Sequence, residues 1–231
     1  MPQPSSARQR RPEQLPPGRH GLPREFVLDN QRQRILAAVA DTVSDVGYAA
    51  MTVEDIIKTA GVSRRTFYEH FKGKEDAFLV SYDDISAQLM QAVEAAFNRA
   101  DSFASRVEDG MRAFLGLLAS EPAYAHMCIV EVLVAGPTAI ERRNGVMRQF
   151  TELIERGAAE ALPKSSRPPE LTAETLVGGV HEVTYARVRR GETARLPELL
   201  PDLTFAILLP YLGREVADVE YRRLRRRKRA S

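Results

Sequence analysis

The sequence predicts an all-α protein with a small N-terminal domain of three helices and a larger C-terminal helical bundle. Three observations lead to this fold class. Apolar residues recur every three or four positions along most of the chain, which is the spacing of amphipathic helices. Prolines fall mainly between these segments, where they end helices. No alternating run of apolar and polar residues is long enough for a convincing β-strand.

Composition narrows the class of protein. The chain has 231 residues, ample for a large core, and one cysteine, Cys128, so we expect neither an internal disulfide nor a cysteine-based zinc site. Charges interrupt the apolar stretches well before the ~18 residues that a membrane helix needs, and the N-terminus lacks the apolar segment of a secretory signal. We therefore expect a cytoplasmic protein with no membrane, metal or cofactor.

Charge is unevenly distributed along the chain. The net charge of +2 combines +4 in residues 1–34, 0 in 35–74, −7 in 75–213 and +5 in 214–231. Basic ends favour a position beside a nucleic-acid duplex through counterion release, whereas the acidic body is repelled from it.

The N-terminal region opens with a segment that has little to bury. Residues 1–24 are rich in Pro, Arg, Gln and Ser, so we expect a disordered basic, proline-rich extension. A helical stripe of apolar residues then runs from Ile35 to Val46, and Gly47 is the predicted end of this helix. The N-terminal domain is predicted to cover residues 25–74.

Residues 52–71, TVEDIIKTAGVSRRTFYEHF, predict two short helices joined by a tight turn. Thr52 is the predicted N-cap of the first helix, with Asp55 three residues later, close to a capping box. Gly61 provides the turn, and Ser63 caps the second helix. The positions expected to face a common core are Val53, Ile56, Ile57, Ala60, Val62, Phe67 and Phe71.

The outer face of the second short helix carries side chains that suit DNA recognition. Arginine can bind guanine with two hydrogen bonds, threonine and tyrosine can reach phosphates or a thymine methyl group, and the helix N-terminus offers free N–H groups. The alternative to DNA contact is a solvated helix face for the basic residues. For Tyr68 and His70 the alternative is partial packing in the core. The outer-face residues are Arg64, Arg65, Thr66, Tyr68, Glu69 and His70, with Lys74 placed to meet a phosphate at the start of the next helix.

The remaining chain predicts helices throughout. A long helix starts near Glu75, and others follow near residues 103–119, 122–135, 138–161, 171–190 and 196–222, with Pro210 as a candidate kink. Together they define a C-terminal domain over residues 75–222. The basic tail at 223–231 is either a second DNA contact or, as we favour, a frayed terminus.

Polar side chains in apolar neighbourhoods of this domain are pocket candidates, because a buried polar group needs a partner. The alternative is that each is satisfied in the core or exposed on a helix flank. Helices 171–190 and 196–212 are the expected dimer helices, since Gly178 and Gly179 allow close approach, and an ordinary intrachain core is the alternative. The pocket candidates are Arg112, Phe114, Met127, Glu131, His181 and Tyr185, with His126, Cys128 and Glu182 as further positions.

The stretch from Arg34 to about Tyr82 resembles the TetR family of transcriptional regulators. It contains RILAAVADTVSDVGYAAMTVEDIIKTAGVSRRTFYEHFKGKEDAF, and its most diagnostic positions are Gly47-Tyr48, Thr52, Ile56, Ala60 to Ser63, Phe67-Tyr68, His70-Phe71 and Lys74-Glu75. The remainder matches only the family's general pattern of a variable helical domain. One departure is the long N-terminal extension, whose arginines are either minor-groove contacts or idle.

The resemblance implies a homodimer whose two recognition helices enter successive major grooves of a palindromic operator in double-stranded DNA. It implies that an unknown small-molecule effector binds the C-terminal domain, shifts the long helix and releases a repressor from its operator. The DNA contacts that it implies are Thr52, Ser63, Arg64, Arg65, Thr66, Tyr68, His70 and Lys74.

Two other functions compete with this interpretation. The first is a constitutive DNA-organising protein, for which a closed and fully packed C-terminal bundle is expected. The second is an enzyme on a helical scaffold, which we do not expect because no catalytic motif is visible and the helix-turn-helix would be left unexplained. An apolar cavity within residues 103–190 would indicate a lipid-like or aromatic effector.

Overall fold

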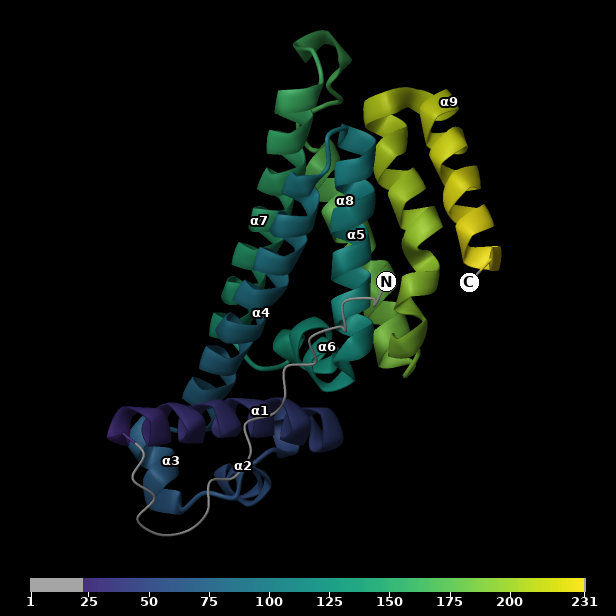
Figure 1. Cartoon of the computed structure of the whole chain (residues 1–231). Helices are drawn as coiled ribbons and strands as arrows, with labels where there is room; N and C mark the ends of the chain where they lie inside the picture. Colours follow the sequence, from purple (N-terminus) through teal and green to yellow (C-terminus); the bar gives the residue numbers. More distant parts are fainter. Residues whose placement is uncertain (1–22, 231) are drawn as a thin grey trace. The chain divides into compact units, whose positions relative to one another are not determined.

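The computed structural model describes residues 23–230, with side chains as far as Arg227 (Figure 1). Every regular element in this part of the chain is a helix, in agreement with the predicted all-α fold. Residues 1–22, on which most of the expected disordered extension falls, lie outside the described residues. The chain divides into two compact units between Ser81 and Tyr82.

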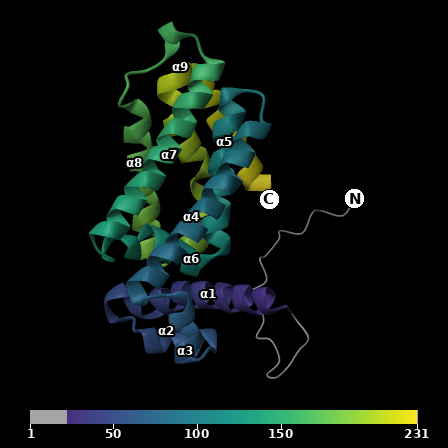
Figure 2. The same cartoon turned by 90° about the vertical axis from the view of Figure 1, so that its left-hand side faces the viewer.

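The first unit is built from α1 (Arg24–Ala50), α2 (Val53–Ala60) and α3 (Arg64–His70), shown in Figure 2. Helix α1 begins at Arg24, so the last residue of the expected extension is helical. Gly47 breaks the helical geometry as predicted, with φ 76° and ψ 157°, and the chain then continues for one further turn to Ala50. Fully or almost fully buried side chains of this unit are Ile35, Leu36, Val39, Val43, Ile56, Phe67 and Phe78.

Helix α4 (Lys74–Arg99) begins in the first unit and continues into the second. Its first turns belong to the N-terminal core, because Phe78 is fully buried and the Ser81 hydroxyl donates a hydrogen bond to the Leu36 carbonyl at 3.1 Å. The division between the units therefore falls seven residues after the expected boundary at 74/75, since α4 has to contribute its first turns to close that core.

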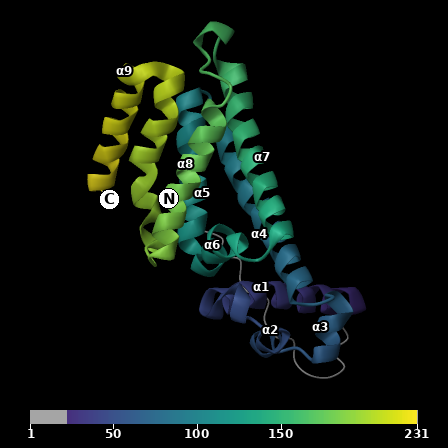
Figure 3. The same cartoon turned by 180° about the vertical axis from the view of Figure 1, so that it is seen from behind.

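The second unit is a helical bundle, and Figure 3 shows its helices from behind. Its elements after α4 follow the predicted order, with most bounds within two residues of expectation. They are α5 (Phe103–Ser120), α6 (Pro122–Ile129), the 3₁₀ turn η1 (Glu131–Leu133), α7 (Pro137–Ala161), the 3₁₀ turn η2 (Lys164–Ser166), α8 (Thr172–Arg189), the 3₁₀ segment η3 (Thr193–Leu199) and α9 (Leu200–Ala230).

The expected helix over 122–135 is two shorter pieces. Helix α6 ends at Ile129, and the chain tightens into η1 before α7 starts at Pro137. Gly136 has φ 106°, a conformation that side-chain-bearing residues rarely adopt, and it sets the turn between η1 and α7. Apolar periodicity across this stretch hides the break, because both pieces bury an apolar face.

The last helix bends at Gly213, where φ is 75° and ψ is 169°, and Pro210 stays within helical geometry. The expectation of a kink at Pro210 is therefore wrong by three residues. After Gly213 the chain doubles back along the first half of α9 (Figure 3). Tyr221 packs edge-on against Phe205, and its hydroxyl donates to Asp202 Oδ1 at 3.2 Å, which joins the two halves.

The expected frayed tail is also corrected, because α9 remains helical to Ala230. Arg223 forms an ion pair with Glu108 of α5, whose side chain is only 6% exposed. Glu108 Oε1 also accepts a hydrogen bond from Arg112 at 2.5 Å, and Arg227 Nη1 lies 3.8 Å from the same oxygen. This Glu108 cluster anchors the second half of α9 to the bundle, since a buried carboxylate needs cationic partners.

Within residues 23–230, no single helix is both long enough and apolar enough to cross a membrane. Helix α5 and the α6–η1 segment pass that test only as a pair, and they are bent by 109° at their junction.

Candidate nucleic-acid interface and effector cavity

Helices α2 and α3 begin with side-chain caps, which fix the turn between them. The Thr52 hydroxyl accepts from the Asp55 N–H at 3.2 Å while the Thr52 N–H donates to Asp55 Oδ2 at 3.0 Å, so the predicted approach to a capping box is a complete one. Hydrogen bonds from Thr52 lower the pKa of the Asp55 carboxyl. At α3 the Thr66 N–H donates to Ser63 Oγ at 3.0 Å.

The turn between α2 and α3 is held by Arg34, a residue that sequence reasoning missed. As predicted, Gly61 forms the turn itself, in a left-handed conformation with φ 62° at the end of α2. The Arg34 guanidinium donates to the carbonyls of Ala60 and Gly61, the latter at 3.0 Å. Carbonyl groups at a helix C-terminus lack partners within the helix and attract cations. Arg34 therefore holds the end of α2 to α1.

The exposed face of α3 carries Arg64, Arg65 and Tyr68. Arg64 pairs with Glu54 of α2 and lies over the Tyr68 ring, with its guanidinium carbon 5.6 Å from the ring centre. Arg65 is the most open of the three, with a side chain 89% exposed and a 3.0 Å contact to Glu69. Tyr68 is 47% exposed although it is aromatic. These three side chains are free to meet a ligand, since surface ion pairs of this kind are weak.

Two predicted DNA contacts are differently placed. Lys74 Nζ donates to the carbonyls of Tyr48 at 3.1 Å and Met51 at 2.9 Å, and it lies 4.9 Å from the centre of the Tyr48 ring. In this conformation Lys74 closes the end of α1 instead of facing outward. His70 is half-buried beside Phe71, its Nε2 is buried without a hydrogen-bond partner, and burial lowers its pKa.

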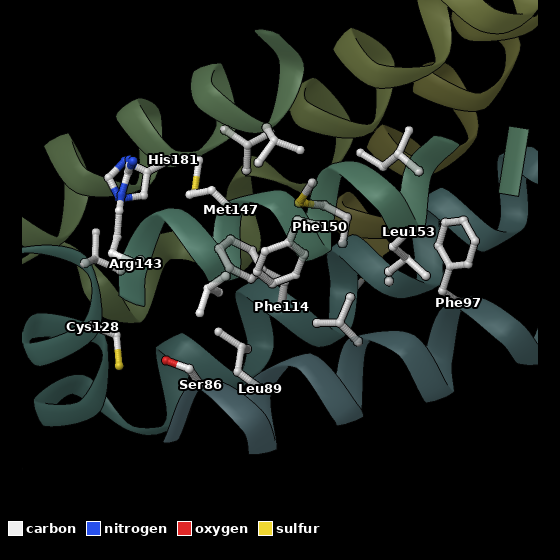
Figure 4. Close-up of a pocket in the computed structure, with 18 of the residues that line it drawn as sticks. Ser86, Leu89, Phe97, Phe114, Cys128, Arg143, Met147, Phe150, Leu153 and His181 are labelled. Atoms are coloured by element: carbon white, nitrogen blue, oxygen red, sulfur yellow. The ribbon is translucent and has the colours of Figure 1, made fainter. Parts of the chain in front are cut away.

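The second unit contains an apolar cavity with a volume of about 100 Å³, lined by α4 to α9 (Figure 4). Its walls are aliphatic and aromatic. Phe114 of α5 and Phe150 of α7 meet edge to face in its middle, with ring centres 5.7 Å apart. Residues lining it include Leu89, Val93, Phe97, Met111, Phe114, Ile129, Met147, Phe150, Leu153, Val177 and Ile207.

One end of the cavity is polar. Arg143 of α7 and His181 of α8 lie beside each other there, with Ser86 of α4 and Cys128 of α6 below them (Figure 4). Burial raises the pKa of Cys128 to about 12, so this thiol is neutral and is not a nucleophile at neutral pH. Burial, with Arg143 as a second cause, lowers the pKa of His181 to about 4.

The opposite end is closed by the Phe97 ring of α4. This ring lies against two glycines, Gly110 of α5 and Gly157 of α7. A Cβ atom at residue 157 would fall 2.4 Å from Phe97 Cζ, so the aromatic ring occupies the space that a side chain there would need. The close approach of α4 and α7 at this end therefore depends on glycine.

Of the six pocket candidates, Phe114 and His181 line the cavity and four do not. Arg112 is part of the Glu108 cluster, and Met127 is buried elsewhere in the core. Glu131 lies 4.0 Å from His126 Nδ1, and Tyr185 packs on the core beside Arg189. Arg112, Glu131 and Tyr185 were selected as polar residues in apolar neighbourhoods and Met127 as a residue of the core or pocket wall, and neither criterion shows the direction of a side chain.

Sequence reasoning missed most of the lining, including Arg143. A signal was present in α7, where one helical face carries Arg143, Val146, Met147, Phe150, Leu153, Ile154 and Gly157. This three- and four-residue spacing places the arginine at the N-terminal end of an otherwise apolar stripe. An arginine in such a position is a candidate for a buried charge.

The geometry defines a class of protein, a helix-turn-helix protein whose second helical unit encloses an apolar cavity. The family model described as bacterial regulatory proteins of the tetR family matches residues 35–79. Over 140 residues the chain is 29% identical to the HTH-type transcriptional regulator EthR of Mycolicibacterium smegmatis, covering 57% of this chain and 64% of EthR. Over 110 residues it is 26% identical to the activator FasR of the same organism, covering 48% of this chain and 50% of FasR.

The fold has similar relatives among solved structures. FadR of Bacillus halodurans, a fatty acid degradation regulator, superposes with a TM-score of 0.69 at 19% identity, covering 79% of this chain and 95% of FadR. FadR of Bacillus subtilis, solved in complex with stearoyl-CoA, superposes with a TM-score of 0.67 at 18% identity, covering 78% of this chain and 98% of that FadR.

Residues 35–79 thus match the tetR family of bacterial regulatory proteins, and the fold is similar to that of solved TetR-like regulators. The matches span only about half to two thirds of EthR and FasR.

Proposed function

We propose that this protein is a homodimeric transcriptional repressor that binds a palindromic operator through α3 and leaves it when a small-molecule effector fills the cavity. The observation that carries the DNA-binding part is the α3 face, where Arg64, Arg65 and Tyr68 are exposed on a short helix held rigidly by two caps. Rigid presentation of such side chains suits recognition in the major groove.

The cavity supports a sensor in preference to a constitutive DNA-organising protein. A fully packed bundle is what a protein without a ligand needs, whereas this bundle keeps an apolar cavity. Helix α4 contributes Leu89, Val93 and Phe97 to its wall and Lys74 to the N-terminal unit, so a ligand that displaces α4 can change both. Such a ligand acts only if it binds the two conformations with different affinities.

The homodimer is supported by an open face on α8. Gly178 and Gly179 are exposed, and a Cβ atom at either would meet nothing within 4 Å, so a second helix can approach closely. Val183 of α8 and Leu209 of α9 are exposed apolar residues of the two helices expected to form the interface. Sedimentation equilibrium tests this assembly, and a monomer at micromolar concentration would contradict it.

DNA recognition is tested by the substitution Arg65→Ala. Because Arg65 has no buried contact, its removal is expected to weaken binding to the operator about tenfold or more and to leave the melting temperature unchanged. Gel-shift titration with an operator fragment selected from random DNA measures the affinity. The matched control is Arg148→Ala, an exposed arginine of α7 in the other unit. Wild-type affinity in the folded Arg65 variant would refute the assignment.

The sign of regulation needs its own measurement, since FasR is named as an activator. Transcription in vitro from a template carrying the operator is expected to fall when the protein is added and to recover when an effector is present. Stimulation of transcription by the protein alone would show that the protein is an activator, and it would not contradict DNA binding through α3.

A further inference from the structure

We propose that the effector is a hydrophobic carboxylate, with its carboxylate held by Arg143 and His181 and its hydrocarbon chain directed toward Phe97. This inference rests on the proposed function, because it names the chemical class of ligand for the same cavity. It is carried by the polar end of the cavity, which has hydrogen-bonding groups and a positive charge but no acidic partner (Figure 4).

Arg143 is the one ionised side chain among the residues that line the cavity, and neither aspartate nor glutamate is among them. Its Nε is buried and makes no hydrogen bond, while Nη1 donates to Asn144 Oδ1 at 3.1 Å. A guanidinium that faces an apolar space without an anion is costly, and a carboxylate is the planar group that its donors fit. The ligand would supply the missing negative charge.

His181 provides a second donor beside Arg143. Its Nε2 is buried and has no hydrogen-bond partner. With a pKa of about 4, the imidazole is neutral at pH 7, and the tautomer that carries its proton on Nε2 can donate to a carboxylate oxygen. Two neighbouring donors, of which only one is charged, match the two oxygens and single charge of a carboxylate better than the double charge of a phosphate monoester.

The rest of the cavity matches a hydrocarbon chain. From the polar end it passes Leu89 and the Phe114–Phe150 pair and ends at Phe97 (Figure 4). No other charged side chain lines this path within the described chain. A ligand with one anionic end and an apolar body therefore satisfies both ends of the cavity, whereas a neutral hydrocarbon leaves Arg143 and His181 without partners.

The test is calorimetric titration of the full-length protein, without DNA, with decanoate, 1-decanol and decanoyl-CoA. Decanoate is expected to bind at least tenfold more tightly than 1-decanol, because only the acid supplies a charge to Arg143. In the Arg143→Met variant, which keeps the apolar stem, decanoate affinity is expected to fall roughly ten- to hundredfold while 1-decanol affinity stays within about twofold. Arg148→Met, an exposed arginine on the same helix, is the matched control and is expected to bind as the wild type does.

Several results would overturn the carboxylate site. Equal affinity of the wild type for decanoate and 1-decanol would contradict it, and no variant is needed for that comparison. Binding of decanoyl-CoA but not of decanoate, or binding of none of the three compounds, would also contradict it. An Arg143→Met variant indistinguishable from Arg148→Met would do so as well. Failure of the proposed function looks different, since decanoate would then bind as described but leave the gel shift with operator DNA unchanged.

Discussion

Arg65 and Lys74 are basic residues of the same unit, predicted alike as DNA contacts, but their surroundings differ. The Arg65 side chain is 89% exposed and contacts Glu69 at 3.0 Å. The Lys74 ammonium is enclosed by the carbonyls at the end of α1, where the helix dipole is negative. Lys74 therefore stabilises the end of α1 in the protein without DNA, and both residues stay predicted DNA contacts.

The substitution Lys74→Met is expected to destabilise the protein by about 1–2 kcal/mol, because it removes a cation from several helix-end carbonyls. Thermal unfolding followed by circular dichroism should show a melting temperature lowered by several degrees. Lys72→Met is the control, since Lys72 is exposed. An unchanged melting temperature combined with weakened DNA binding would restore Lys74 to the direct DNA contacts.

At the scale of elements, the unexpected feature is the second half of α9. Gly213 reverses the chain, and Arg223 then reaches the buried Glu108 of α5. Some arginines of this segment therefore bind Glu108 within the same chain, whereas the sequence alone indicated a frayed tail. One buried carboxylate decides whether this segment is docked.

Glu108→Gln is expected to loosen the second half of α9 without unfolding the bundle, because Arg223, Arg227 and Arg112 lose their shared anion. Limited trypsin digestion measures this directly, since the segment is rich in arginine. The initial rate of cleavage there should rise about tenfold. Glu215→Gln, an exposed glutamate on the same segment, should digest at the wild-type rate. Equal rates in the two variants would show that Glu108 does not hold the segment.

Periodicity predicted nearly all helices, because each buries one apolar stripe. The breaks at Ile129 and Gly213 were missed or misplaced, since apolar spacing continues across them. In the candidate site, α3 could be predicted from the sequence because its caps and core positions are local in sequence. The cavity could not be predicted, because its lining residues come from α4 to α9. Arg143 also lies in a run, Glu141 to Asn144, that resembles an ordinary solvated helix turn.

At the scale of the whole molecule, charge is distributed unevenly along the chain. Residues 75–213 carry a net charge of −7, and basic charge is concentrated toward the ends of the chain. Binding to DNA is then expected to depend on a small number of cations near α3, with the acidic body contributing repulsion. The DNA contacts at Thr52, Ser63, Arg64, Arg65, Thr66, Tyr68, His70 and Lys74 all stay predictions.

The logarithm of the operator affinity is expected to fall linearly with the logarithm of salt concentration, with a slope of about −4 for roughly five phosphates neutralised per dimer. Fluorescence anisotropy at several potassium chloride concentrations measures the slope. If Arg65 contacts a phosphate, Arg65→Ala should make the slope shallower by about 2, one unit per protomer, whereas a contact to a base edge leaves it nearly unchanged. A flat slope in the wild type would argue against DNA as the partner.

The contact between Phe97 and Gly157 makes the depth of the cavity adjustable by single substitutions. Any side chain at residue 157 would push the aromatic ring away from α7, and a smaller side chain at residue 97 would open space beyond the present end wall. Neither residue is part of α3. If the cavity holds a hydrocarbon chain and α3 reads DNA, as we propose, the accepted chain length can therefore diverge between relatives, or be redesigned, while the DNA sequence stays the same.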